Sequence, residues 1–378
     1  MRFSKRICLS TPTMHGEEMQ FVQEAFDKNW IAPLGFNCDG FEEGMSSYLG
    51  DGKTDKYHCL ALASGTAAIH LAIKLAGVKP GDTVFCSDTT FAATVNPVSY
   101  EGAKQVFIDS EYETWNMDPA ALEKAFEKYP DTKVVALAHL YGTPAKMDEL
   151  LAVCKKYGAV LVEDAAEALS ATYKGIKCGT FGTYNIVSFN GNKIITSSGG
   201  GMLITGEKAA RDKALFWATQ AREVAPWYQH EEIGYNYRMS NVVAGIGRGQ
   251  LLHLEEHREL KKAIYNRYKE GLKDLPIKMN PFLAESEPNF WLSCMLIDKG
   301  VDVSPMDIIK RLDEANVEAR PIWKPMHMQP VFKGHDFISA EDASVGEDIF
   351  SRGLCLPSDI KMTKEEQDFV IEVIKSMF

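Results

Sequence analysis

The sequence predicts an α/β protein with a mainly parallel sheet, helices on both faces of that sheet, and a smaller C-terminal α/β domain. Its 378 residues exceed one ordinary domain. Between residues 58 and about 220, continuous apolar runs typical of strands buried on both faces alternate with amphipathic stretches. We therefore expect a large domain over residues 1–250 and a small domain over residues 251–378.

Seven short apolar runs are strand candidates, at residues 59–63, 83–87, 105–109, 133–140, 159–164, 184–189 and 201–205. The stretches "TAAIHLAIKLAG" (66–77) and "MDELLAVCKKYG" (147–158) have helical spacing and end at glycine. A longer helical pattern starts near Ser240 and continues through "LLHLEEHRELKKAIYNRYKEGL". Since ligands of such sheets bind beyond the carboxyl ends of the strands, polar residues at those ends are the candidates for function.

Composition narrows the function classes. The net charge of −11 argues against binding to nucleic acid or to an anionic membrane surface. The eight cysteines form no C-x-x-C pair, which favours free thiols in a reducing cytoplasm over a zinc site or disulfides. Neither a signal-peptide core nor a membrane-length apolar run is present. We expect a cytoplasmic protein, without a metal, whose partners are small molecules and a second copy of itself.

Lys193 stands alone in the stretch "YNIVSFNGNKIITSSGGGML" (184–203). No other charged residue lies within ten positions of it on either side. Lysines on a solvated face usually have charged neighbours. Neutral polar neighbours instead leave the lysine amine available as a nucleophile and proton shuttle. The pattern indicates a functional lysine.

An acidic pair ends the strand candidate in "VLVEDAAEAL" (160–169). Asp164 at the carboxyl end of a buried strand is poorly solvated, so it is expected to face a cation or a ligand. The alternative is that Asp164 caps a helix formed by "AAEAL".

The stretch "ALASGTAAIHLA" (61–72) reads as strand, Ser-Gly-Thr, then helix. Amides exposed at the helix N-terminus, with Gly65 allowing close approach and hydroxyls such as that of Thr66, make a phosphate cradle. A plain helix cap at Ser64 or Thr66 is the alternative.

Together these three features fit pyridoxal phosphate, which needs an anchored phosphate, a carboxylate at its ring nitrogen and a lysine bonded to its aldehyde. Ser188, on the strand that enters the Lys193 turn, adds a hydroxyl for the phosphate. Phe91, after the strand at 83–87, is a candidate to stack on the ring, and a core phenylalanine at a helix start is the alternative.

The stretches "SGTAAIHLA", "VEDAAEALS", "SFNGNKIITSSGGGML" and "GYNYRMSNVVAGIGRGQL" resemble the DegT/DnrJ/EryC/StrS-type sugar aminotransferases, pyridoxal phosphate enzymes of fold type I (aspartate aminotransferase-like). The resemblance covers essentially the whole chain. Within the family, "NWIAPLG" and "EARPIWKPMHMQPVFKG" are most similar to the transaminases that aminate carbon 4 of a UDP-linked 4-keto-6-deoxy-N-acetylhexosamine, as in bacillosamine biosynthesis.

The resemblance implies roles for individual residues. Lys193 would bond to the cofactor, Asp164 would face the pyridine nitrogen, and Glu167, at a position that is often Gln or His in the family, would lie near the phenolic oxygen. The remaining cofactor residues are Gly65, Thr66 and Ser188 at the phosphate, Phe91 on the ring, and Asn236, which reaches the phosphate from the neighbouring subunit. The active sites would then be shared across a homodimer.

The resemblance also implies a nucleotide-sugar site. Its substrate-binding candidates are Trp30, Ala32, Arg238, Arg320, Lys324 and His327. In "RPIWKPMH" the cations would grip a diphosphate while Trp323 supplies an apolar wall. The alternative for this stretch is a surface loop with incidental charge.

The expected function is amino transfer from glutamate to the nucleotide sugar, for glycan or polysaccharide biosynthesis. Alternatives are a dTDP-linked or 3-keto nucleotide sugar as the acceptor, a pyridoxal phosphate-dependent sugar dehydratase, which has His in place of the lysine, and a non-catalytic nucleotide-sugar sensor.

The stretch "HLEEH" (253–257) matches a zinc-protease pattern. Because it lies in a charge-rich helical pattern without an obvious third ligand, we expect a solvated helix face there.

Overall fold

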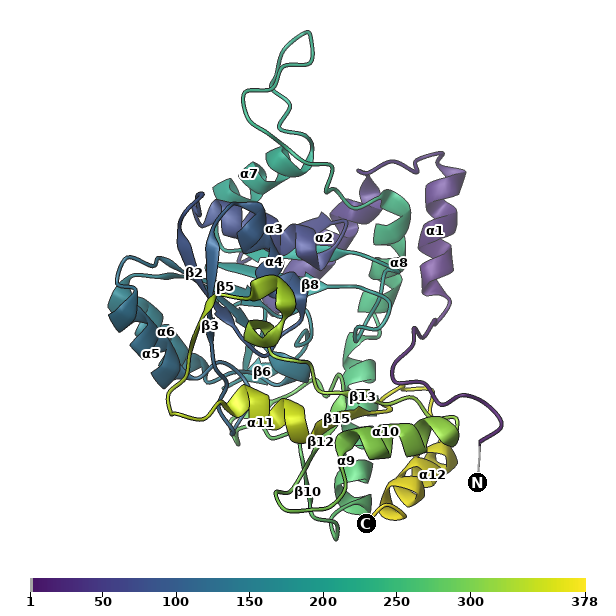
Figure 1. Cartoon of the computed structure of the whole chain (residues 1–378). Coiled ribbons are helices and arrows are strands. Elements are labelled where there is room, and N and C mark those ends of the chain that lie inside the picture. The colour runs from purple at the N-terminus through teal and green to yellow at the C-terminus, as the bar shows by residue number, and fades with distance from the viewer. Residues whose placement is uncertain (1–2) are drawn as a thin grey trace.

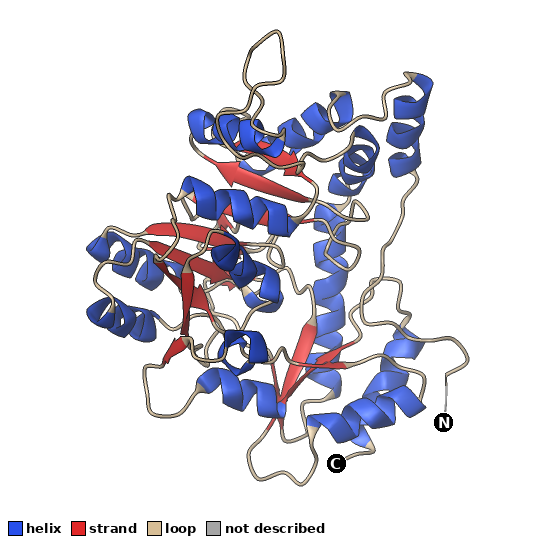
Figure 2. Cartoon of the chain, turned by 45° about the horizontal axis from the view of Figure 1, so that its top comes forward, coloured by secondary structure: helices blue, strands red, loops and turns tan. Residues whose placement is uncertain are grey.

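A computed structural model describes residues 3–378 and places an eight-stranded sheet at the centre of the larger part (Figures 1 and 2). In spatial order its strands are β1 (His58–Leu62), β9 (Gly201–Thr205), β8 (Tyr184–Ser188), β5 (Val160–Asp164), β4 (Val134–Ala138), β2 (Thr83–Ser87), β3 (Lys104–Ile108) and β14 (Asp336–Ile338). Only β9 runs antiparallel to its neighbours among these described strands. The predicted mainly parallel sheet and all seven predicted strands are confirmed, and β14 is added.

Helices cover both faces of the sheet. One face carries α3 (Gly65–Leu75), α4 (Ala92–Tyr100) and α7 (Lys208–Ala218), and the other carries α2 (Phe36–Leu49), α5 (Pro119–Lys128), α6 (Met147–Tyr157) and α8 (Asn241–Leu251). Successive residues of a strand point to opposite faces, so Val134 and Ala136 pack on the first face while Val135 and Leu137 pack on the second. Such double burial explains why the strands read as continuous apolar runs.

The predicted helix ends follow from local chemistry. The Ser64 hydroxyl accepts a hydrogen bond from the Ala67 amide and caps α3. Helix α6 ends at Gly158, whose φ of 65° lies in the left-handed region that glycine adopts without strain. Both boundaries lie close to the predicted ones.

A four-stranded antiparallel sheet forms the centre of the smaller part, in the order β10 (Ile277–Met279), β12 (Ser293–Ile297), β15 (Gly353–Leu356) and β13 (Arg320–Pro321). It packs against α9 (Leu254–Gly271), α10 (Pro305–Glu314), α11 (Val345–Arg352) and α12 (Lys364–Lys375). The division at residue 250 stays a prediction; Ile7 bridges to Val317 in the small part, and β14 joins the large sheet.

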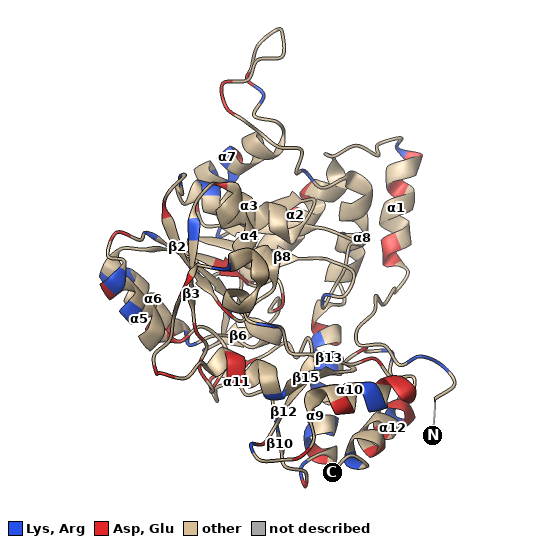
Figure 3. Cartoon of the chain, viewed as in Figure 1, with Lys and Arg blue, Asp and Glu red and all other residues tan. Residues whose placement is uncertain are grey.

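The other elements are short or peripheral. They are α1 (Glu17–Asp27), the three-stranded sheet of β11 (Ser286–Glu287), β6 (Thr172–Tyr173) and β7 (Ile176–Lys177), and the 3₁₀ turns η1 (Leu140–Gly142), η2 (Met326–Met328) and η3 (Pro330–Phe332). Charged residues gather on outer helices such as α5, α10 and α12, whereas α3 and α8 carry few (Figure 3). Within residues 3–378, no helix has the length and apolar character needed to cross a bilayer.

The long helix predicted from Ser240 is interrupted. Helix α8 ends at Leu251 and α9 begins at Leu254, because the amides of Leu252 and His253 bond to carbonyls three residues earlier instead of four. The expectation of a solvated face at "HLEEH" is wrong for His257, which is only 2% exposed.

Candidate active site

A cavity of about 480 Å³ lies at the carboxyl ends of β5 and β8, where the N-termini of α3 and α4 meet them. Its lining includes the predicted cofactor residues Gly65, Thr66, Phe91, Asp164, Glu167, Ser188 and Lys193, together with Trp291 and Trp323 of the smaller part. Residues far apart in the sequence therefore meet at the edge of the sheet where ligands of parallel sheets bind.

The N-terminus of α3 forms one end of the cavity. The Ser64 cap uses the amide of Ala67, so the amides of Gly65 and Thr66, in the first turn, have no carbonyl partner within the helix. A Cβ on Gly201 of β9 would lie 2.4 Å from the Gly65 nitrogen, so only glycine allows β9 to pack this closely against the turn. The Ser188 hydroxyl lies beside Gly65, as the phosphate-cradle interpretation requires.

Lys193 projects from the loop that follows β8. Its amide donates to the Asn190 carbonyl at 3.0 Å, which closes a tight turn and fixes the side chain at the cavity. Its Nζ lies 3.6 Å from Glu167 Oε1 and 4.2 Å from the ring centroid of Trp291. The ammonium is therefore held by a carboxylate and by the face of an indole ring.

Trp291 was missed by the sequence interpretation. Its indole Nε1–H donates to the Asn192 carbonyl at 2.6 Å, and its own carbonyl accepts from the buried Lys261 ammonium at 3.0 Å. These bonds tie the smaller part of the molecule to the Lys193 loop. No local pattern in the sequence marks this tryptophan, because its partners are distant along the chain.

The Asp164 carboxylate lies deep in the cavity at the end of β5. It accepts from the Thr94 hydroxyl at 2.7 Å and from the Ala166 amide at 3.0 Å. Burial raises the pKa of Asp164, so a cation placed against it would be strongly favoured. The helix-cap alternative is wrong, because turns follow Asp164 where a helix was considered.

Glu167 is fixed by the strained η1 turn. Its Oε2 accepts the Tyr141 amide at 2.7 Å, and Tyr141 has φ of 52°, in the left-handed region. The Tyr141 hydroxyl accepts the backbone N–H of Trp323 at 3.0 Å. Burial raises the pKa of Glu167 to about 7, which places its titration in the physiological range.

Replacing Glu167 by Gln should change how stability depends on pH. The folded protein keeps a proton on Glu167 between its ordinary pKa of 4.5 and the raised value of about 7, whereas the unfolded chain releases it. Wild-type stability from this group is therefore fully present below pH 4.5 and is lost as pH rises through about 7. Between roughly pH 5.5 and 8, the free energy of unfolding of the Gln variant should therefore rise by about 2 kcal/mol relative to that of wild type.

Urea unfolding of the two cofactor-free chains at several pH values measures this difference. The Gln side chain keeps an oxygen for the Tyr141 amide, so the variant should fold normally. Stability curves for wild type and variant that run parallel over this range would contradict the raised pKa.

Phe91 and Trp323 form an aromatic pair at the cavity. Phe91 is the residue before α4 and is 55% exposed, so the alternative of a core phenylalanine is wrong. Its ring centroid lies 5.4 Å from that of Trp323, at an angle of 48°. The pair offers two ring faces to a planar or sugar-like ligand.

The other predicted site residues do not line this cavity in a single chain; they are Asn236, Trp30, Ala32, Arg238, Arg320, Lys324 and His327. Arg238 binds Glu42 and the Ala61 carbonyl. His327 lies between the carboxylates of Asp88, at 2.7 Å, and Glu347, at 3.1 Å, which raise its pKa against the effect of burial. Their substrate roles stay predictions.

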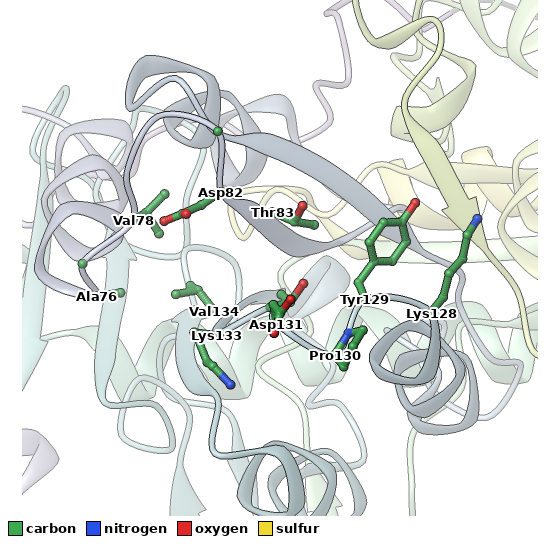
Figure 4. Close-up of a pocket in the computed structure, with 13 residues that line it drawn as sticks. Ala76, Val78, Asp82, Thr83, Lys128, Tyr129, Pro130, Asp131, Lys133 and Val134 are labelled. Carbon is green, nitrogen blue, oxygen red and sulfur yellow. The ribbon is translucent and has the colours of Figure 1, made fainter.

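A second cavity, of about 520 Å³, lies at the amino ends of β2 and β4 (Figure 4). Asp82, Lys133 and Asp131 are among the residues that line it. Because it lies at the amino ends of the strands, away from Lys193, it lacks the position expected of the active site.

Comparison with known proteins identifies the family. Residues 12–375 match the DegT/DnrJ/EryC1/StrS aminotransferase family. The chain belongs to this family. It is 51% identical over 380 residues to EpsN of Bacillus subtilis (strain 168), whose name describes a pyridoxal phosphate-dependent aminotransferase, with 99% of this chain and 96% of EpsN covered.

Two further similar proteins support the assignment. The GDP-perosamine synthase of Caulobacter vibrioides is 33% identical over 371 residues, which cover 98% of this chain and 97% of the synthase. The crystal structure of the aminotransferase TlmJ from Streptoalloteichus hindustanus superposes with a TM-score of 0.88 at 26% identity and covers 97% of each chain. The chain is a pyridoxal phosphate-dependent sugar aminotransferase with the corresponding fold.

The cavity fits this cofactor. The α3 amides and Ser188 would hold its phosphate, Asp164 its ring nitrogen, and Lys193 its aldehyde carbon. The close approach of β9 at Gly201 shapes a cradle that any larger side chain would fill. When bound, the cofactor supplies an electron sink for carbanion chemistry.

Proposed function

We propose that this aminotransferase moves an amino group from glutamate to carbon 4 of a UDP-linked 4-keto-6-deoxy-N-acetylhexosamine, for glycan or polysaccharide biosynthesis. The observation that carries the proposal is the meeting of Lys193, Asp164 and the α3 amides in one cavity beside the exposed Phe91 and Trp323 rings. A relative of Bacillus subtilis (strain 168) at 30% identity, SpsC, is named a spore coat polysaccharide biosynthesis protein, which supports the biosynthetic context.

A GDP-linked sugar is the second candidate acceptor. Relatives named GDP-perosamine synthase, at 33% and 30% identity, favour it. A dTDP-linked or 3-keto nucleotide sugar is a further alternative. The dehydratase alternative requires a site without the lysine, and Lys193 is present.

The residues of this cavity have distinct tasks in the proposed reaction. With the cofactor bound, Lys193 would move a proton at the substrate carbon, and its loop holds the amine at the cavity. Glu167, whose Oε1 lies 3.6 Å from Nζ, would hold the amine in position between these transfers. Asp164 would hold the ring nitrogen of the cofactor in its protonated form, because its buried carboxylate would gain a cationic partner.

A substrate panel tests the proposal. The purified enzyme is incubated with glutamate and with 3-keto and 4-keto sugars linked to UDP, GDP or dTDP, and each product is identified by mass and NMR. We expect the highest kcat/KM with the UDP-linked 4-keto-6-deoxy-N-acetylhexosamine. A preference of about tenfold or more for the GDP-linked sugar, which corresponds to about 1.4 kcal/mol, would favour the second candidate.

We also propose a homodimer with shared active sites. The arm of residues 222–234, between α7 and α8, projects from the body at the top of Figure 1 and exposes Trp227 and Tyr228 by 65% and 77%. Aromatic side chains on a projecting arm are typical of an interface. Asn236 follows this arm and does not reach the Lys193 cavity of its own chain, so a role at the partner's cavity fits its position.

Trp30 and Ala32 support the same proposal. Both are anchored by Asn241, whose side-chain amide donates to the Trp30 carbonyl and whose backbone amide donates to the Ala32 carbonyl. This loop thus lies beside the start of α8, close to the chain segment that carries Arg238. We propose that Trp30, Ala32 and Arg238 contact the substrate in the partner's site.

A cytoplasmic location is supported by the eight cysteines, all of which are free.

Mixing two inactive variants should restore activity if the sites are shared. Lys193→Ala and Asn236→Asp would each inactivate their homodimers, the second because a carboxylate would face a phosphate dianion. A mixed dimer contains one site with both changes and one with neither. After equal subunit exchange, activity should therefore return towards a quarter of wild type.

Subunit exchange is verified by native mass spectrometry on differently tagged chains. Two preparations of Lys193→Ala mixed with each other serve as the control and should stay inactive. If verified mixed dimers stay inactive, Asn236 does not act at the partner's cofactor.

A further inference from the structure

Asn289 lies between β11 and β12, where the smaller part of the molecule packs on the loop that carries Glu167. The residue is fully buried. Its side-chain Nδ2 donates to the Glu167 carbonyl at 2.6 Å and to the Leu169 carbonyl at 2.8 Å, and its Oδ1 accepts the Trp291 amide at 2.9 Å. Because both N–H groups and the oxygen are used, the orientation of this carboxamide is fixed.

The main chain of Asn289 makes a further contact with the η1 turn. Its amide donates to the Gly142 carbonyl at 3.1 Å. A Cβ on Gly142 would lie 1.8 Å from Asn289 Oδ1, so only glycine lets the turn approach the carboxamide this closely. The Tyr141 amide in the same turn donates to the Glu167 carboxylate. Asn289 therefore binds the backbone of Glu167 and also the turn that orients its carboxylate.

Three residues near Asn289 have an unusual backbone conformation. Tyr141, Ser170 and Phe290 have φ of 52°, 74° and 55°, in the left-handed region that non-glycine residues rarely adopt. Each is the chain neighbour of a residue to which Asn289 is hydrogen-bonded. Such conformations cost free energy and persist only where the surrounding structure fixes them. The hydrogen bonds of one buried residue reach all three segments.

Two of the bonded segments carry the groups that contact the Lys193 amine. Glu167 Oε1 lies 3.6 Å from Nζ, and the centroid of the Trp291 ring lies 4.2 Å from it. The Trp291 indole also donates to the carbonyl of Asn192, the residue before the lysine, at 2.6 Å. Asn289 itself does not line the cavity. It can therefore influence the amine only through these neighbours.

We propose that Asn289 is a positioning residue that holds Glu167 and Trp291 against the Lys193 amine. Its carboxamide sets the distance between the Glu167 loop and Trp291, and thereby fixes the lysine side chain from two sides. A displacement of about 1 Å at a reacting group can lower a rate by about 10²-fold. This inference rests on the role proposed above for Lys193.

Asn289→Ser tests the proposal beside a matched control, Asn185→Ser. Asn185 of β8 is also buried, donates to the carbonyls of Gly182 and Ile204, and accepts the Gly182 amide, but it does not line the cavity. The shorter serine side chain replaces only part of these hydrogen bonds, so both variants should have a lower thermal midpoint than wild type. Only the change at Asn289 should affect Lys193.

A second variant, Asn289→Asp, leaves no cavity. It keeps the shape of the side chain and the oxygen that accepts the Trp291 amide, and it loses the NH₂ group that donates to the Glu167 and Leu169 carbonyls. It should change Lys193 in the same direction as Asn289→Ser. Circular dichroism shows whether each variant is folded.

The first measurement uses the full chain without cofactor and so does not depend on its activity. Each protein is treated with a limiting amount of acetic anhydride, and mass spectrometry of the peptides gives the rate of acetylation of Lys193 relative to that of the exposed Lys156. Release of the Lys193 amine from its carboxylate and indole neighbours should raise the relative rate by about threefold or more in both Asn289 variants. Asn185→Ser should leave it unchanged.

The second measurement is the half-reaction of the cofactor-loaded enzyme with glutamate, which does not involve the sugar. In both Asn289 variants the maximal rate should fall about tenfold or more, while the glutamate concentration that gives half of this rate should change by less than about threefold. Asn185→Ser should match wild type. A sugar panel without any product would contradict the proposed acceptor, whereas the acetylation of Lys193 would still decide the role of Asn289.

The proposal is overturned if the folded Asn289 variants differ from wild type only in their thermal midpoint, with Lys193 acetylated at the wild-type rate. It is equally overturned if Asn185→Ser raises the relative acetylation of Lys193 as much as the Asn289 variants do.

Discussion

Lys193→Ala should lose amino transfer by a factor of about 10⁴ or more while remaining a folded protein that binds the cofactor. In the proposed reaction the lysine would supply both the nucleophile for the cofactor and the base that moves the proton, and each role would contribute a large factor. Its side chain contacts Glu167 and the Trp291 ring at the edge of a cavity, so its removal opens no void in the apolar core. Single-turnover kinetics with glutamate measures the loss.

Borohydride reduction gives a second readout for this lysine. Mass spectrometry of the reduced wild-type protein should find the cofactor on the peptide that contains Lys193, and the variant should carry none. Small primary amines added to Lys193→Ala should restore part of the proton transfer, because they fit the space that the side chain leaves. Lys156→Ala is the control and should behave as wild type, because Lys156 of α6 forms an exposed ion pair with Glu123 of α5. A few per cent of residual activity in the Lys193 variant, or cofactor on another lysine, would contradict the assignment.

The sequence predicted those parts of the site that depend on local pattern. The strands are buried on both faces, so their apolar runs could be located, and the turns at Ser64 and Lys193 follow such runs directly. The pair Glu163-Asp164 shows the limit of this reasoning. The pleat sends the two side chains to opposite faces, so Asp164 faces the cavity while Glu163 binds His139 and the loop at 179–182.

Contacts between distant segments could not be predicted. Trp291 reaches Lys193 only because the smaller part packs against the Lys193 loop, and Thr94 reaches Asp164 only because α4 begins beside β5. Glu167 is distant from Lys193 along the chain, so the sequence likewise did not show that the two side chains lie close together. Such pairs depend on chain topology, for which the periodicity of a single segment carries no information.

The break between α8 and α9 has the same origin. The apolar spacing continues through Leu252 and His253, but the N-terminal segment crosses there, and Gln250 donates to the Thr13 carbonyl at 2.6 Å. Tertiary contacts of this kind can override a local helical preference.

Asp164→Asn should lower the rate of amino transfer by about 10³ or more, equivalent to roughly 4 kcal/mol, without lowering stability. Asparagine can keep both contacts of the aspartate, because its oxygen accepts the Ala166 amide and its NH₂ group can donate to Thr94, whose hydroxyl also bonds to Thr90. Burial raises the pKa of Asp164, so removing its charge also relieves a cost of desolvation in the cofactor-free chain. Activity and thermal midpoint should therefore separate.

A cofactor analogue distinguishes the electrostatic role of Asp164 from a packing role. Methylation of the pyridine nitrogen gives the ring a permanent positive charge that needs no carboxylate to maintain it. In Asp164→Ala, which leaves room for the methyl group, the methylated cofactor should restore a substantial part of the lost rate. In wild type the same analogue should bind poorly, because the methyl group would occupy the position taken by the ring-nitrogen proton. If Asp164→Asn lowers only the thermal midpoint, or if the methylated cofactor gives no recovery in a folded Asp164→Ala protein, the carboxylate does not hold the ring nitrogen.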